Sequence, residues 1–177
     1  MAWRTYILLT AGLLLVACQQ QRPEPKGVKK AERGPDYRGW RRVTEFPLHL
    51  APQLAMLCRK DPIHDGAPHP SAVFHVYVNP MGKAVMLGRS LKTPFPDGTI
   101  IIKEKWSRAA FGANHNTKEL PKTKPDLLTM MTKVKGKWKW SVVKNGLVQT
   151  EDMSHCAKCH ESAKDTDYVF RNYLTKS

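Results

Sequence analysis

The sequence is poor in cysteine, with four in 177 residues. A structural zinc site normally takes two closely spaced pairs of ligands, and one such cysteine pair is present, near the C-terminus. The other two cysteines, Cys18 and Cys58, lie forty positions apart and do not form a second pair. Scarcity of cysteine therefore argues against a zinc-ribbon type of domain. Cys58 lies in an apolar run, which favours a buried structural thiol.

The sequence also lacks an apolar run of the roughly twenty residues that a membrane span needs. Its most apolar stretch lies within residues 1–17, where Arg4 precedes the apolar residues and Cys18 follows them. This order resembles a bacterial lipoprotein signal, which is cleaved before a cysteine whose thiol is then acylated. We expect an exported protein, lipid-anchored through Cys18 on the periplasmic side of a bacterial membrane. An ordinary secretory signal and a single membrane anchor are the alternatives.

The closely spaced pair belongs to a C-x-x-C-H motif formed by Cys156, Cys159 and His160. Two thiols about one helical turn apart can each add to a vinyl group of one haem, and the adjacent imidazole can then reach the iron. A redox-active C-x-x-C pair is instead expected early in a βαβ unit. The motif predicts one covalently attached haem c with His160 as iron ligand. A simple disulfide and half of a zinc site are the alternatives.

Residues 18–36 combine glutamine, proline and charge without apolar periodicity, which predicts a flexible tether after the lipidated Cys18. The remaining residues, 37–177, have the length of one domain. We expect this segment to be the haem domain.

Acidic residues are scarce: 15 stand against 29 lysines and arginines, and the net charge is +14. Such an excess favours contact with anionic lipid headgroups or with an acidic redox partner protein. A solvated basic surface is an equally good interpretation, because the lysines are scattered. Nucleic acid is not expected, since an exported haem protein seldom meets it.

The domain carries strand signals in its middle and helix signals at its two ends. Alternation predicts that Phe74, Val76 and Val78 lie on one face of their strand. It also predicts that Trp138, Trp140 and Val142 lie on one face of theirs. Together these patterns predict an α+β fold that is mainly β, an antiparallel sheet with a few flanking helices and a c-type haem near the C-terminus; a four-helix cytochrome bundle is a poor match. The predicted strands are Ala72–Asn79, Thr99–Lys105, Leu127–Val134 and Trp138–Lys144, and the predicted helices are Leu48–Lys60 and Glu161–Leu174.

Three segments, Phe74–Asn79, Pro94–Glu104 and Cys156–Phe170, resemble the cytochrome P-460 and cytochrome c′-beta family. The resemblance extends from about Tyr37 to Tyr173. It implies a largely antiparallel β fold, usually a homodimer, with one haem per chain. It also implies His160 as the proximal ligand and an open distal position on the iron. Members of the P-460 branch oxidise hydroxylamine, whereas the c′-beta branch binds nitric oxide.

Lys103 matches the lysine that is bonded to the haem macrocycle in the P-460 branch. Strand alternation places it with Thr99 and Ile101, whereas Glu104 takes the opposite face. A lysine among apolar neighbours can lose its proton and become a nucleophile. The alternative is a surface lysine paired with Glu104 or another acid.

Two other positions bear on the distal side of the haem in this resemblance. Phe74 stands where cytochromes P-460 tend to carry arginine, and an aromatic residue there is the c′-beta manner of favouring small uncharged ligands. Glu151, nine residues before His160, lies about where active members carry a distal carboxylate that takes protons from hydroxylamine. Gln149 competes for that place, and Glu151 could instead be a solvated loop acid.

Three functions remain open from the sequence. The first is an oxidoreductase acting on hydroxylamine or nitric oxide, with Lys103 tuning the haem, Glu151 accepting protons and a separate protein accepting electrons. The second is a nitric oxide binding or carrier protein in which Phe74 crowds the distal side. A simple electron carrier is the least favoured, because the methionines and remaining histidines suit core and surface roles better than a sixth iron ligand.

Overall fold

The computed structural model describes residues 32–49, 72–111, 118–149, 153–171 and 174. All of them belong to one compact unit that spans Ala31–Ser177. Among these residues, no helix combines the length and the apolar character that crossing a membrane requires. The expected signal sequence, the lipidated Cys18 and nearly all of the expected tether fall outside the described residues.

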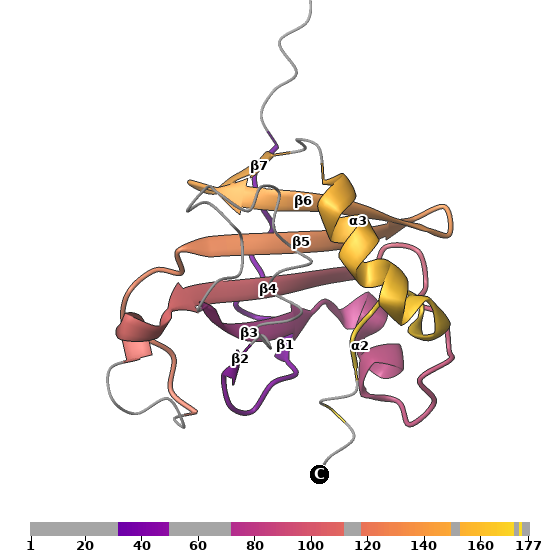
Figure 1. Ribbon diagram of the computed structural model, residues 1–177, viewed down its shortest axis with the longest axis horizontal. Helices are drawn as coiled ribbons and strands as arrows, with labels where there is room; N and C mark the ends of the chain where they lie inside the picture. Colours follow the sequence, from indigo (N-terminus) through magenta and orange to yellow (C-terminus); the bar gives the residue numbers. More distant parts are fainter. Residues whose placement is uncertain (1–31, 50–71, 112–117, 150–152, 172–173, 175–177) are drawn as a thin grey trace, which may run out of the picture. The chain divides into compact units, whose positions relative to one another are not determined.

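One antiparallel sheet forms the centre of the unit (Figure 1). Its long strands follow one another in the order β3, β4, β5 and β6, so each pairs with its neighbour in the sequence. Two tight turns join β5 to β6 and β6 to β7, with positive φ at Lys135 and Gly136 and at Asn145 and Gly146, as two-residue hairpins require. The predicted α+β fold, mainly antiparallel sheet with short flanking helices, is confirmed. The strands are β1 (Arg41–Arg42), β2 (Leu48–His49), β3 (Ala72–Val78), β4 (Ile100–Ser107), β5 (Leu127–Val134), β6 (Lys137–Lys144) and β7 (Leu147–Gln149).

Helical segments are short: α2 (Pro80–Leu87), η1 (Arg108–Phe111), α3 (Ser154–His160) and η2 (Glu161–Thr166). The sequence analysis missed α2, which follows β3 directly. Asn79 caps it by accepting a hydrogen bond from the Gly82 amide at 3.2 Å, and Pro80 occupies the first turn. The same Asn79 side chain accepts from the Ile100 amide at 3.1 Å, which ties the helix start to β4.

Both predicted helices need correction. Leu48 and His49 form β2, paired with Phe74 and Val73, because their backbone groups complete the edge of β3; the rest of the predicted helix 48–60 lies outside the described residues. The predicted helix Glu161–Leu174 is also wrong. The α-helical segment begins earlier, at Ser154, and continues as a 3₁₀ helix that ends at Thr166. A left-handed backbone at the next residues stops it.

The sheet separates two sets of buried residues. On the face that we call the site face, Phe74, Val76 and Val78 pack with Ile101 and Met131. Trp138 and Trp140 pack against the same cluster. This arrangement confirms that the three β3 residues share a face. The opposite face, which we call the far face, carries Tyr37, Tyr77 and Ile102 in one cluster and Val73, Trp106 and Phe111 in another.

Candidate functional site

Helix α3 holds both cysteines of the C-x-x-C-H motif. Cys156 and Cys159 are three residues apart in the helix, so their side chains project from the same side. Cys159 is buried and Cys156 is half-buried, and neither is in a disulfide. Burial raises the pKa of the Cys156 thiol, and the positive charges of Lys105 and Lys103 oppose that shift. Burial therefore favours the protonated form of Cys156, and the two thiols lie about one helical turn apart, as attachment of one group requires.

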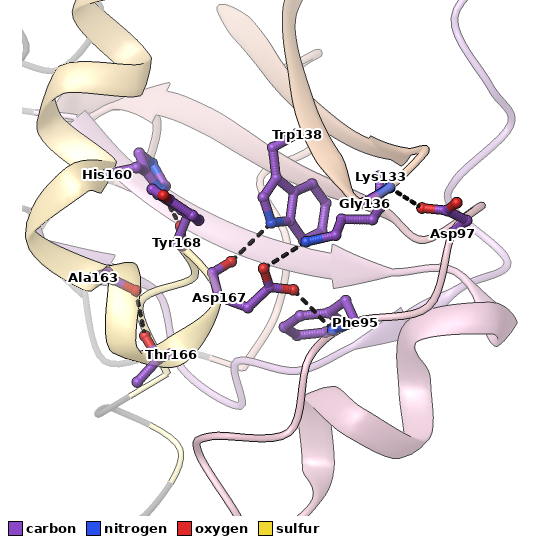
Figure 2. A network of polar contacts seen from close by, with 10 residues as sticks. All are labelled: Phe95, Asp97, Lys133, Gly136, Trp138, His160, Ala163, Thr166, Asp167 and Tyr168. Atoms are coloured by element: carbon purple, nitrogen blue, oxygen red, sulfur yellow. Dashed lines mark hydrogen bonds and ion pairs between the residues drawn. The ribbon is translucent and has the colours of Figure 1, made fainter.

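His160 ends α3 with its ring held on two sides. Its Nδ1 lies 2.7 Å from the carbonyl oxygen of Tyr168 (Figure 2). A carbonyl can only accept, so Nδ1 carries the hydrogen and Nε2 keeps its lone pair. The ring centre lies 4.4 Å from that of Trp140 on β6 and 5.0 Å from that of Phe170. These contacts place the end of α3 against the sheet (Figure 1).

The pKa of His160 is lowered to about 4, first by burial and next by the charge of Lys103. Lys105 lowers it further, while the hydrogen bond to Tyr168 opposes the shift. At neutral pH the imidazole is therefore uncharged, which is the form that binds a metal. A hydrogen bond from Nδ1 to a carbonyl is the usual partner of a ligating histidine, because it fixes both tautomer and ring orientation.

This donor set fits a c-type haem. Two thiols on one side of a helix could form the thioether bonds, and Nε2 of His160 could bind the iron. No group of three or more histidine, cysteine or acidic residues that could hold a metal ion occurs in the part of the chain that the structure describes.

Lys103 lies on β4 with Val76 as its neighbour on β3, so it projects to the site face. Its Nζ is 4.7 Å from the centre of the Phe74 ring, a cation–π contact. Its effect on the pKa values of Cys156 and His160 places its charge near α3. Glu104 projects to the far face, where it pairs with Arg38 and accepts a hydrogen bond from Tyr37 at 2.7 Å. Lys103 and Glu104 thus project to opposite faces of the sheet and do not pair with each other.

Phe74 is buried on the site face, with 6% of its surface exposed. The structure therefore brings Phe74 and Lys103 to the same face as the C-x-x-C-H helix. Glu151, the candidate proton acceptor, lies outside the described residues. Gln149, which competes for its role, ends β7.

Several residues of this region were missed by the sequence analysis. Lys105 is buried on the site face next to Phe74 in the strand register; the period-2 alternation that assigned Lys103 could have assigned it as well. Trp140 was placed on the right face, but nothing in the pattern indicated its contact with His160. Phe170 and the Tyr168 carbonyl reach the histidine through a chain reversal that has no clear sequence signal.

A family model described as Cytochrome P460 matches residues 34–171. The match covers the whole sheet, Phe74 and Lys103, and the C-x-x-C-H helix. A search of curated proteins gave no match. The family consists of haem proteins related to hydroxylamine oxidation, which agrees with the donor set on α3 and confirms the resemblance drawn from three sequence segments. The chain belongs to the cytochrome P460 family.

Proposed function

We propose that this chain is an exported monohaem protein that carries out redox conversion of a small nitrogen oxide, hydroxylamine or nitric oxide, at an open iron site. The observation that carries the proposal is the meeting of three features on one sheet face: the C-x-x-C-H helix, Lys103, and the Phe74 ring 4.7 Å from its ammonium. Cys156 and Cys159 would hold the haem through thioethers, and His160 would bind its iron through Nε2. The bound haem supplies an iron that takes up a nitrogen ligand and exchanges electrons.

Lys103 is the candidate for a covalent link to the haem macrocycle. It is half-buried beside Ile101 and Phe74 on the face that carries the helix, and its amine would act as a nucleophile toward a bound haem after losing its proton. The placement of Glu104 on the far face supports this role, because that carboxylate is engaged with Arg38 and Tyr37. Glu151 is proposed to accept protons from the substrate.

Phe74 supports a second candidate function. A buried aromatic ring excludes water and gives no hydrogen bond to a charged ligand, so it favours nitric oxide over anions. In this alternative the protein binds or carries nitric oxide without turnover. The two functions share the haem and differ in what Lys103 does.

The remaining parts of the proposal concern the setting of the protein. Lipid attachment at Cys18 would hold it on the periplasmic side of a bacterial membrane, in a compartment where haem c is made. The net charge of +14 favours an acidic redox partner that accepts electrons. A homodimer is expected from the family.

The test compares the holoprotein with Lys103→Met and Lys105→Met. Lys105 is a matched control, since it lies two residues further along the same strand and face. A cross-link at Lys103 predicts that proteolysis of the denatured wild type yields a haem peptide containing residue 103 as well as the cysteines, and that the ferrous Soret band is red-shifted. Both features should vanish in Lys103→Met and persist in Lys105→Met.

Turnover is tested separately by mixing each holoprotein anaerobically with hydroxylamine and an artificial oxidant. Consumption of oxidant above a free-haem control supports the redox function, and its loss in Lys103→Met assigns that residue. If wild type consumes none but binds nitric oxide, the carrier function holds. If it does neither, both proposals fail.

A further inference from the structure

Asp167 follows the helix that carries His160, the candidate iron ligand, and makes polar contacts with several other segments of the chain. One carboxylate oxygen, Oδ1, lies 2.5 Å from the Lys133 ammonium, and the other, Oδ2, accepts a hydrogen bond of 2.8 Å from the Phe95 amide (Figure 2). Its carbonyl oxygen accepts from the Trp138 indole at 2.8 Å, and its own amide donates to Lys164 at 3.1 Å. One residue thus joins β5, β6 and the loop before β4 to the end of η2.

These contacts hold two residues in an unfavourable backbone conformation. Asp167 and Tyr168 both have left-handed φ values, 55° and 62°. Left-handed geometry is unfavourable for residues other than glycine, and two such residues in succession persist only when their surroundings enforce them. The second residue is a tyrosine, whose amide donates a hydrogen bond to the Ala163 carbonyl at 2.8 Å. Asp167 and its partners add the contacts that tie this pair to β5, β6 and the loop before β4.

The left-handed pair determines where the Tyr168 carbonyl points. Its oxygen meets Nδ1 of His160 at 2.7 Å, eight residues back along the chain. The Asp167 carboxylate and Lys133 are both largely buried, with side-chain exposures of 12% and 6%. A charge-assisted pair in such a place is a stiff anchor, because losing one partner leaves a buried charge.

We propose that Asp167 is a positioning residue for His160: clamped by Lys133, Phe95 and Trp138, it holds the Tyr168 carbonyl on Nδ1 and thereby sets the orientation and donor strength of the axial imidazole. The inference rests on the part of the proposed function in which His160 binds the haem iron. A strong Nδ1 hydrogen bond gives the ring imidazolate character and strengthens electron donation to the metal. The clamp therefore keeps the iron–histidine bond stiff and the reduction potential low.

The experiment uses haem-loaded wild type and the variant Asp167→Asn, which keeps the size of the side chain and its tolerance of left-handed geometry. Resonance Raman spectroscopy of the ferrous state gives the iron–histidine stretching frequency, and a redox titration gives the potential. In Asp167→Asn we expect the frequency to shift down and the potential to shift up. Lys133→Met should shift both in the same directions.

Two controls separate positioning from general loosening. Asp165→Asn removes the same charge from an exposed position in the same 3₁₀ segment. Thr166→Val removes two hydrogen bonds of the loop, to the carbonyls of Ala163 and Val169, without touching the clamp. Both should keep the wild-type frequency and potential. An equal shift in Thr166→Val, or no shift in Asp167→Asn and Lys133→Met, overturns the inference.

None of these measurements uses a nitrogen substrate. If the wild type neither binds nitric oxide nor turns over hydroxylamine, the proposed function fails. The iron–histidine frequency and the reduction potential still test the role of Asp167. If the five-coordinate, high-spin ferrous wild type lacks an iron–histidine stretch, His160 does not bind the iron and the inference falls.

Discussion

Strand β4 distributes its buried charges differently to the two faces of the sheet. On the far face the carboxylate of Glu104 is fully buried and partly compensated: Tyr37 donates to Oε1 and Arg38 pairs with the same oxygen, whereas Oε2 has no hydrogen-bond partner among the described residues. Burial still raises its pKa, so the partners only partly offset the loss of water. On the site face, the charged groups of the same strand are lysines directed toward α3.

A single strand makes this separation. Along β4, Lys103 and Lys105 alternate with Glu104, so the backbone sends cations to one side and the anion to the other. The acid that is nearest in sequence is therefore engaged elsewhere, and it does not neutralise the lysines beside the cysteines and histidine. Burial, and after it the charge of Lys103, lowers the pKa of His160 and keeps the histidine on this face neutral.

The largest effect that distinguishes the faces is the loss of the cofactor. We expect the double substitution Cys156→Ser and Cys159→Ser to abolish covalent haem completely, because no thiol remains on α3 to form a thioether. Glu104→Gln, on the far face, should keep it. Haem staining on a denaturing gel, after expression in a maturation-competent host, gives the readout. If the double variant still stains for haem, the haem is attached elsewhere.

Far-face stability should depend strongly on the Glu104 acceptor. Glu104→Ala leaves the buried Tyr37 hydroxyl without its acceptor and opens a cavity, so we expect a loss of about 3 kcal/mol in the free energy of unfolding. Glu104→Gln keeps an acceptor oxygen and should cost much less. Urea unfolding of both variants checks this, and equal losses would mean that the acceptor contributes little.

The far face should also set the acid sensitivity of the fold. Burial, and then the charge of Arg42, lower the pKa of His75 to about 4 from an ordinary value of 6.5. Between these pH values the unfolded chain binds a proton that the folded state does not, so stability falls as the pH drops, by at most about 3 kcal/mol in total. His75→Asn should flatten this slope in pH-dependent unfolding of the holoprotein. An unchanged slope would assign the acid sensitivity to other groups.

The smallest effect is expected at an exposed ion pair. Lys118 and Glu45 pair with 60% and 64% of their side-chain surfaces exposed. Water and salt screen such a pair, so Glu45→Gln should change the unfolding free energy by less than about 0.5 kcal/mol. Thermal unfolding at low and high salt measures it. A loss as large as that of Glu104→Ala would contradict the contrast between buried and exposed charge.

The central strands could be predicted because their signals are local. β3, β5 and β6 combine β-branched or aromatic residues with period-2 alternation, and a Lys-Gly and an Asn-Gly turn close the hairpins. The helices could not be predicted equally well. Apolar spacing after Glu161 suggests a helix, yet the contacts of Asp167 with three other segments reverse the chain there. Tertiary contacts of this kind leave no trace in a short window.

The candidate site divides in the same way. The haem-binding motif and the face of Lys103 follow from spacing and alternation. By contrast, the packing of His160 between Trp140 and Phe170 depends on where α3 lies on the sheet, which no spacing encodes. Glu151 stays a prediction, since it lies outside the described residues.

Burial of Cys159 has a consequence for biogenesis. Its side chain is almost completely enclosed once α3 lies on the sheet, with 4% exposed. On the proposed function, a maturation enzyme would bring haem to that sulfur only while the helix is undocked, so attachment would precede the last folding step. Because α3 follows all the strands in the chain, the hairpins could assemble before the haem is attached. Pulse-labelled thiol accessibility during refolding of the apoprotein would show this window as late protection of Cys159.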